Sequence, residues 1–311
     1  MRIYQHWQGL EPHSRGASVA MGNFDGVHLG HQSVIDLARD HGPRHAPLGI
    51  VTFEPHPREF FAPDAPAFRL MNAEARANRL AKLGVQHLYQ LEFNAALAAL
   101  SPEGFAADVL AGGLGVSHVV VGADFRFGRG RRGSAQDLQT LGIKHGFAVT
   151  IADLIHSDGQ EISSTAIRQA LSDGRPRDAA AMLGHWHRIE GEVIHGEKRG
   201  RDLGFPTANM SVSGLHLPRL GVYAVKVDVL TGPQAGSYNG AASLGVRPMF
   251  GENLPNLESF LFDFKGNLYG QHLSVAFIDY LRPELKFDDL AALITQMNAD
   301  CSRAREILAA L

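Results

Sequence analysis

In the first half of the chain, short apolar segments alternate with stretches in which apolar residues recur at helical spacing. The apolar segments cover residues 17–21, 47–53, 85–91, 117–122 and 146–152. The helical stretches between them cover residues 28–39, 72–83, 102–111 and 136–145. Strands that alternate with helices predict a parallel sheet covered on both faces, with right-handed crossovers.

The pattern changes towards the second half, where apolar and polar residues alternate. The alternating segments cover residues 189–194, 222–230, 237–244, 257–264 and 272–279, and turn signals such as LTGPQAG and KGN separate them. This predicts an antiparallel barrel or sandwich. A last helix is predicted over 288–311, with one apolar face made of Leu290, Leu293, Ile294, Met297, Cys301, Ala304, Ile307 and Leu308. We place the domain boundary between residues 186 and 187, and we expect residues 61–68 to form an ordered loop or lid.

Composition narrows the setting in which the chain works. Apolar residues make up 45% of the 311 residues, charged residues 20%, and the net charge is -3. There is no basic excess for a nucleic acid or an anionic membrane, and one cysteine excludes an intramolecular disulfide framework and Cys-based zinc sites. No apolar run reaches the roughly 18 residues of a membrane span. We therefore expect a cytoplasmic protein; whether it forms a homo-oligomer stays open.

The stretch VAMGNFDGVHLGHQSV, residues 19–34, places glycines and histidines where a strand gives way to a helix. Gly22 and Gly26 let the backbone approach a ligand, and a helix N-terminus suits phosphate. His28 and His31 are three residues apart, so their rings can point the same way and donate to phosphate oxygens. The alternative is a tight turn with two surface histidines, but the flanking strand and helix favour the phosphate site.

A second candidate segment is EISSTAIRQAL, residues 161–171. Ser163 or Ser164 stands at a helix start, where hydroxyl and N–H groups can hold a phosphate. Arg168 lies one turn further and can neutralise charge on a pentavalent phosphorus. The alternative interpretation is a plain N-cap followed by a solvated arginine.

A third candidate segment is VVVGADFRFGRGRRG, residues 119–133. It predicts a strand followed by Asp124, two aromatic residues and a group of arginines. Phe125 and Phe127 can pack on a flat ligand or on the protein core, and both alternatives stay open. The arginines after Gly128 are equally compatible with simple solvation.

The second half contains a glycine-rich, basic segment, VIHGEKRGRDLGFPTANM, at residues 193–210. It is not a Walker A loop, because no Gly-Lys-Ser/Thr follows at the required spacing. If the segment is extended, Thr207 and Asn209 face the same side. Neutral oxygen ligands of this kind suit Mg²⁺ bound together with substrate phosphates. The alternative is a turn followed by an edge strand.

A carboxylate on an aromatic strand face marks the segment LESFLFDFKGNLYG, residues 257–270. Alternation puts Leu257, Ser259, Leu261 and Asp263 on one side, and Glu258, Phe260, Phe262 and Phe264 on the other. Burying a carboxylate without a partner is costly, so Glu258 needs a reason to be there. It is either a general base for a hydroxyl or one half of a buried ion pair.

Together the motifs GNFDGVHLGH, TFEPHP, GADFRFG, ISSTAIR and LGFPTAN resemble those of the prokaryotic bifunctional riboflavin kinase/FMN adenylyltransferases, also called FAD synthetases. The resemblance covers nearly the whole chain. It implies a Rossmann-like α/β nucleotidyltransferase domain over residues 1–186. It implies a small antiparallel Greek-key barrel with a C-terminal helix over residues 187–311. The substrates implied are riboflavin, FMN and ATP with Mg²⁺, and FMN and FAD are intermediate and product.

In the first domain the resemblance implies that FMN attacks the α-phosphorus of ATP, giving FAD and pyrophosphate. His28, His31 and Arg168 are implied as catalytic residues. The residues implied at the ATP phosphates are Gly22, Asn23, Phe24, Asp25, Gly26, Ser163, Ser164 and Thr165. Those implied near a flavin or nucleotide pocket are Asp124, Phe125 and Phe127. No general base is needed, because a phosphate monoester is already anionic near neutral pH.

In the second domain the resemblance makes Glu258 the base for the riboflavin 5′-hydroxyl, which attacks the γ-phosphorus of ATP. Thr207 and Asn209 are implied at Mg²⁺, and Arg247 at the flavin or nucleotide pocket. The residues implied at ATP are Gly196, Lys198, Gly200, Gly204 and Pro206. Ser243, Met249 and Phe260 depart from the family pattern. The alternatives are therefore an enzyme with one live activity, or a flavin- or nucleotide-binding module without turnover.

Overall fold

The computed structural model describes residues 1–153, 156–157, 160–196, 204–249 and 252–311. The chain forms two compact units. The first unit comprises Met1–Pro66 and Arg76–Ile162, and the second comprises Ala67–Ala75 and Ser163–Leu311. The second unit therefore takes a short segment from within the first half of the chain.

The first unit is built on a parallel sheet with strand order β1-β4-β3-β2-β5-β8. Its strands are β1 (Arg2–Tyr4), β2 (Ser18–Met21), β3 (Leu48–Glu54), β4 (His87–Glu92), β5 (His118–Gly122), β6 (Arg126–Phe127), β7 (Gly133–Ser134), β8 (Ala148–Ala152), β9 (His156–Ser157) and β10 (Gln160–Glu161). Its helices are η1 (Pro12–Ser14), α1 (Leu29–His41), α2 (Pro57–Phe61), α3 (Ala73–Lys82), α4 (Ala95–Ala99), α5 (Pro102–Gly104), η2 (Phe105–Leu114), η3 (Arg129–Arg131) and α6 (Ala135–His145).

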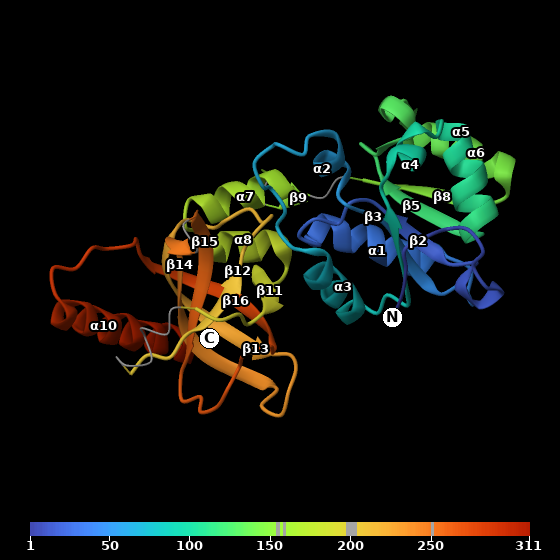
Figure 1. Ribbon diagram of the computed structural model, residues 1–311. Coiled ribbons are helices and arrows are strands. Elements are labelled where there is room, and N and C mark those ends of the chain that lie inside the picture. The colour runs from blue at the N-terminus through green and yellow to red at the C-terminus, as the bar shows by residue number, and fades with distance from the viewer. Residues whose placement is uncertain (154–155, 158–159, 197–203, 250–251) are drawn as a thin grey trace. The chain divides into compact units, whose positions relative to one another are not determined.

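Alternating side chains of β2 show how the two faces of this sheet are covered. Val19 and Met21 join the apolar core that includes residues of η2 and α6. Ser18 points to the other face, where its hydroxyl donates to the carbonyl of Ala38 in α1 at 2.6 Å. Figure 1 shows α1 and α6 on the two sides of the sheet. The predicted parallel α/β architecture is confirmed.

The helix predicted over 102–111 is partly wrong. It begins at Pro102 as expected, but from Phe105 it continues as the π-helix η2 to Leu114. Gly115 ends it in the left-handed region, at φ 57°, which a glycine adopts without strain. Helices α2 and α4, of five residues each, were too short for helical periodicity to reveal.

The second unit is an antiparallel sheet with strand order β11-β16-β13-β14-β15-β12. Its strands are β11 (Arg188–Glu192), β12 (Ala208–Ser211), β13 (Gly221–Val229), β14 (Gly236–Met249), β15 (Glu252–Leu261) and β16 (His272–Arg282), and its helices are α7 (Ser164–Ser172), α8 (Pro176–Leu183) and α10 (Leu290–Ala309). Ile194, just beyond β11, bridges to Asn209 of β12, so the two ends of the sheet meet and form a near-barrel. The predicted antiparallel fold with a C-terminal helix is confirmed.

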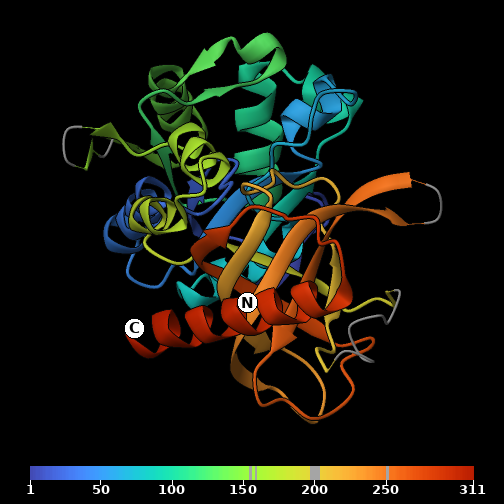
Figure 2. The same ribbon diagram turned by 90° about the vertical axis from the view of Figure 1, so that its left-hand side faces the viewer.

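Helix α10 covers one side of this near-barrel, as Figure 2 shows. Ala304 and Leu308 pack with Phe262 and Ala276 in a cluster separate from the barrel core. The predicted apolar face of α10 is right except at its start, because Leu290 is 56% exposed. An ion pair that hydrophobic patterning missed joins Arg282 to the buried Asp300 at 2.7 Å and ties α10 to β16.

The strand predicted over 257–264 ends early, at Leu261. Asp263 has φ 59°, so the chain turns there and the alternation of faces is broken. Phe264 and Tyr238 contact each other and pack against the barrel core, and Leu261 belongs to that core. Phe264 is therefore on the side opposite to the one predicted, whereas Phe260 and Phe262 lie together in the cluster under α10.

Among the described residues, none of the helices is long and apolar enough to cross a membrane.

Candidate active sites

The loop between β2 and α1, residues 22–28, has an unusual backbone. Phe24, Gly26 and Val27 have φ values of 52°, 87° and 44°. Only the glycine adopts this region freely; a β-branched valine there is strained. Phe24 and Val27 are nevertheless buried at 1% and 0% exposure, so packing fixes the strained conformation. The side chain of Asn23, in contrast, is exposed.

The structure brings the rings of His28 and His31 together, as the sequence predicted. They stack with their centroids 3.7 Å apart and an angle of 17° between the planes. His28 is the N-cap of α1, and its Nδ1 accepts from the backbone N–H of His31 at 3.3 Å. In the neutral ring, an accepting Nδ1 places the ring proton on Nε2.

Burial of His31, and secondarily the proximity of His28, lower the pKa of His31 well below its ordinary value. His31 is therefore neutral at pH 7. Its Nδ1 is buried and has no hydrogen-bond partner among the described residues. A buried polar atom of this kind next to a helix N-terminus fits a ligand that supplies the missing hydrogen bond.

In the segment after β5, Phe125 and Phe127 differ in burial. Phe127 is 7% exposed and packs in the core, and a Cβ on Gly133 would lie 2.7 Å from its ring. Of the two alternatives, Phe127 thus adopts the core position. Phe125 is half-buried and stacks on Phe127 with centroids 5.8 Å apart, and Asp124 is exposed. A role at a flavin or nucleotide pocket stays a prediction for Asp124, Phe125 and Phe127.

An aromatic group that was not predicted lies at the carboxyl ends of β3 and β4. Phe60, Phe61 and Phe93 contact one another edge-on, with centroids 5.2–5.7 Å apart. Phe61 is 68% exposed although it is a large apolar side chain. Phenylalanines dispersed over residues 60–93 show no periodicity, and only the parallel register brings them to one edge.

From Ser163 onward, the residues of the ISSTAIR motif belong to the second unit. Ser163 is the N-cap of α7, and its hydroxyl accepts from the N–H of Ala166 at 3.3 Å. Arg168 is not the solvated arginine of the alternative interpretation. Its Nε donates to the carbonyl of Phe68 at 2.6 Å, and its guanidinium lies over the Phe68 ring. The phosphate roles of Ser163, Ser164, Thr165 and Arg168 stay predictions.

In the second unit, strand register brings Asn209 and Glu258 together. Glu258 of β15 lies directly opposite Asn209 of β12 on one side and Ser243 of β14 on the other. Directly opposed residues of antiparallel strands carry their side chains on the same face, about 5 Å apart. The predicted metal ligand and the predicted base therefore share one face of the barrel wall.

The amide of Asn209 is held in place. Its Oδ1 accepts from Nδ2 of Asn256 at 3.0 Å, and both side chains are buried. Gly196 leaves the room that this amide needs, because a Cβ there would lie 2.6 Å from Cγ of Asn209. Asn256 is a site neighbour that the sequence analysis missed, since nothing distinguishes an asparagine two residues before the glutamate without knowledge of the register.

A cavity of about 440 Å³ lies beside this face. Phe205, Phe260 and Phe262 line it from the barrel, and Cys301 and Arg305 from α10. Phe205 contacts Phe260 edge-on, with centroids 5.3 Å apart. Phe260 is two residues from Glu258 on β15, so one wall of this cavity lies on the same strand face as the carboxylate.

Some predicted residues are only partly described. Lys198 and Gly200 lie outside the described residues, and so does the side chain of Arg247, whose backbone pairs with Leu254. Gly204, with φ 85°, and Pro206 are exposed and precede β12, and Thr207 is half-buried immediately before it.

The residues around Glu258 fit a Mg²⁺ ion that is bound together with substrate phosphates. The described residues contain no group of three or more His, Cys, Asp or Glu suited to a metal. Mg²⁺ usually takes only one or two protein oxygens and keeps water and substrate phosphates as its other ligands. A fixed amide oxygen of Asn209, with Glu258 opposite, meets that requirement.

Two family models match the chain in the same order as its two folds. The model described as FAD synthetase matches residues 10–166, and the model described as riboflavin kinase matches residues 183–308. Together with the α/β unit and the near-barrel, they define the class: a transferase with a nucleotidyltransferase part followed by a kinase part.

Curated relatives cover nearly the full length. The bifunctional riboflavin kinase/FMN adenylyltransferase of Pseudomonas fluorescens is 40% identical over 99% of this chain and 98% of its own. The enzyme of the same name from Escherichia coli (strain K12) is 38% identical over 94% of this chain and 92% of its own length. A solved structure described as a macrolide-efflux protein from Streptococcus pneumoniae has a TM-score of 0.81 and 30% identity over 96% of both chains. The chain belongs to the family of bifunctional riboflavin kinase/FMN adenylyltransferases.

Proposed function

We propose that the chain converts riboflavin to FMN with ATP in its second unit, and FMN to FAD with ATP in its first unit. The observation that carries this proposal is the pairing of Asn209 with Glu258 on one strand face, beside a cavity lined by aromatic side chains. A carboxylate next to an oxygen ligand and an aromatic hollow suits a hydroxyl nucleophile attached to a flat ring.

In the kinase step, Glu258 accepts the proton of the riboflavin 5′-hydroxyl as its oxygen bonds to the γ-phosphorus and ADP leaves. Thr207 and Asn209 hold Mg²⁺, which when bound neutralises phosphate charge. The cavity beside Phe260 takes the flavin ring, because stacking on Phe205 and Phe260 matches a flat aromatic ligand. Arg247, Gly196, Lys198, Gly200, Gly204 and Pro206 contribute to the flavin and ATP contacts.

In the adenylyl-transfer step, an FMN phosphate oxygen bonds to the α-phosphorus of ATP and pyrophosphate leaves. The loop of residues 22–28 binds the ATP phosphates, and His28 and His31 donate to charge on the pentavalent phosphorus. Phosphate-binding roles for Ser163, Ser164, Thr165 and Arg168 are part of the same proposal. No base is required, so the task of the protein is positioning and charge stabilisation.

Incubation with riboflavin, ATP and Mg²⁺, followed by chromatography of the flavins, tests the proposal. FMN should accumulate first and FAD later. FAD formed only from added FMN would leave the adenylyltransferase as the one live activity, and no product from either flavin would leave a binding module. Omitting Mg²⁺ should abolish both products.

We also propose that the functional boundary lies between residues 186 and 187. A fragment of residues 187–311 keeps Asn209, Glu258 and the barrel core, so it should phosphorylate riboflavin, while residues 1–186 should adenylylate FMN. The fragment of residues 187–311 lacks Asn72 and Glu74. It therefore loses the 2.8 Å hydrogen bond from Asn72 Nδ2 to the carbonyl of Glu190 and the 2.9 Å ion pair of Glu74 with His272. It should therefore melt earlier than the full chain. A folded fragment without kinase turnover would contradict this boundary.

A further inference from the structure

The backbone carbonyl of Asn23 accepts two hydrogen bonds from buried side chains. Thr52 Oγ1 donates to it at 3.2 Å, and Arg76 Nη1 at 3.3 Å. Thr52 is fully buried on β3, and the side chain of Arg76, on α3, is 3% exposed. Polar groups at such depth are costly unless they form hydrogen bonds, and both side chains use this carbonyl as an acceptor.

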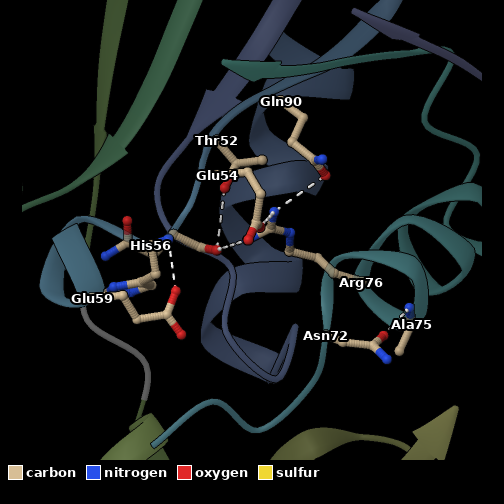
Figure 3. Close-up of polar contacts among 9 residues, drawn as sticks. Thr52, Glu54, His56, Glu59, Asn72, Ala75, Arg76 and Gln90 are labelled. Carbon is tan, nitrogen blue, oxygen red and sulfur yellow. Dashed lines mark hydrogen bonds and ion pairs between the residues drawn. The ribbon is translucent and has the colours of Figure 1, made fainter. Parts of the chain in front are cut away.

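Arg76 is itself held from two further directions, as Figure 3 shows. Its Nη2 donates to Glu54 Oε2 at 2.9 Å and to Gln90 Oε1 at 3.2 Å. Gln90 of β4 lies opposite Thr52 of β3, and Glu54 follows two residues later on the same face. The guanidinium thus sits at the carboxyl ends of two parallel strands and cannot shift without breaking several bonds.

The charge of Arg76 is balanced by Glu54, which argues against a direct role at phosphate. The geometry of the contact points to the backbone instead. The residue after Asn23 is Phe24, at φ 52°, and Val27 at φ 44° follows before the helix. A backbone in such sparsely populated regions persists only where its surroundings fix it. Arg76 and Thr52 fix the carbonyl at the start of that stretch.

We propose that Arg76 is a positioning residue for adenylyl transfer. With Thr52, it anchors the Asn23 carbonyl and thereby holds the loop of residues 22–28 in the shape that receives the ATP phosphates. Arg76 touches neither ATP nor FMN. The inference rests on the phosphate-binding role proposed above for this loop.

The test uses the full chain with two substitutions and a conservative rescue. Arg76→Met keeps the unbranched apolar stem of the side chain and removes every donor, so kcat/KM for ATP in FAD formation should fall about 10²-fold, the scale of a loop misplaced by about 1 Å. Arg76→Lys keeps three donors for the three acceptors and should stay within about tenfold of the unchanged enzyme. KM for FMN and the riboflavin kinase rate should change less than twofold in both.

Thr52→Val removes only the hydroxyl and should lower the same kcat/KM about tenfold. Because Thr52 and Arg76 act on one carbonyl, Thr52→Val/Arg76→Met should lose less than the product of the two single effects. If Arg76→Met does not fold, Thr52→Val decides alone: an unchanged FAD rate in that variant overturns the proposal. An additive double variant overturns it as well.

Tyr89→Phe is the matched control. Tyr89 precedes Gln90 on β4 and is buried, and its hydroxyl donates to the carbonyl of Ser14 at 2.7 Å. Removing that bond should lower the melting temperature without changing FAD formation per folded molecule. An equal fall in FAD formation for Tyr89→Phe and Arg76→Met would reduce Arg76 to a stabilising residue and overturn the proposal.

A His28→Ala arm separates the two levels of inference. If His28→Ala lowers FAD formation and Arg76→Met does not, the anchoring role fails and the loop keeps its proposed function. If His28→Ala leaves FAD formation unchanged, the loop does not serve ATP, and the inference about Arg76 fails with it.

Discussion

In the first unit the proposed phosphate-binding residues lie on a loop between β2 and α1, whereas in the second unit Asn209 and Glu258 lie on paired strands. The loop owes its shape to buried neighbours, including Arg76 and Thr52, that hold a backbone with positive φ angles. The strand site owes its shape to register, which places Glu258 opposite Asn209 without any strained residue between them. Substitutions remote in sequence from the loop, at Arg76 or Thr52, should therefore change the geometry of the first site. The geometry of the second site should depend on the residues directly paired with Glu258.

The largest effect should come from the loop histidines. In a His28→Ala/His31→Ala variant, FAD formation should fall about 10⁴-fold, because each lost donor to transition-state charge costs about 10²–10³. FMN formation should be unchanged, since that step belongs to the other unit. Coupled chromatographic assays of both products on one preparation provide the measurement. His41→Ala, at the far end of α1, is the control and should leave both rates intact; FAD formation at the original rate would show that the loop is only a turn.

At the strand site, Glu258→Gln should lower the kinase turnover by about 10²–10⁴, because glutamine keeps the shape but cannot accept the proton. Riboflavin affinity should change far less, and added FMN should still become FAD. Single-turnover phosphorylation and the melting temperature are to be measured on the same sample. Asp228→Asn is the control, because it removes the charge that pairs with Arg188 at 2.7 Å. It should melt earlier and keep normal turnover, as expected of a structural carboxylate. If Glu258→Gln behaves in that way, the assignment of Glu258 as the base is wrong.

The same contrast explains what sequence could predict. Apart from β1, the strands of the parallel sheet were predicted from local periodicity, and the spacing of His28 and His31 predicted that their rings can point the same way. The contact of Arg76 with the Asn23 carbonyl was not, because it joins residues 53 positions apart through strand order and a helix packed on the sheet.

In the second unit, alternation predicted Glu258 on the face of Phe260, which holds, but carried it on to Phe264, which does not. The failure begins at Asp263, where a residue with φ 59° turns the chain. No local signal announces a non-glycine residue in that conformation. The neighbours of Glu258 are set by register. The resemblance implied Asn209 at Mg²⁺ of the same reaction but not its position opposite Glu258, and Asn256 was not predicted at all.

A smaller effect should follow from adding one carbon beside Asn209. In Gly196→Ala the new Cβ would lie 2.6 Å from the amide of Asn209, which must then move. We expect the kinase kcat to fall about tenfold and FAD formation from FMN to stay constant. Gly191→Ala is the matched control in the same unit, because its Cβ would only reach the methyl of Met210 at 3.7 Å. Equal kinase rates for Gly196→Ala and Gly191→Ala would contradict the importance of the amide position.

The smallest effect concerns stability, and it uses a histidine that serves no site. His187 is 2% exposed, and burial, aided by the nearby charges of His185 and His216, lowers its pKa from 6.5 to about 3. Its Nε2 has no hydrogen-bond partner among the described residues. Between pH 6.5 and pH 3 the unfolded chain therefore binds a proton at this histidine that the folded chain does not, and folding is favoured less as the pH falls.

The free energy of unfolding of the second unit should thus decrease by about 1.4 kcal/mol for each pH unit below 6.5 from His187 alone. His187→Phe keeps a flat ring beside Phe277 and removes that dependence, so its stability should exceed that of the unchanged chain by a margin that grows as the pH falls from 6.5 to 5. Urea unfolding followed by Trp186 fluorescence in a Trp7→Phe background reports on this unit. Kinase turnover at pH 7.5 should be the same in both proteins, because His187 touches neither Asn209 nor Glu258 in the described structure. In the first unit, the buried His31 belongs to the proposed site, so the matching substitution there would change FAD formation together with stability. Parallel pH slopes for His187→Phe and the unchanged chain would show that His187 is charged in the folded state.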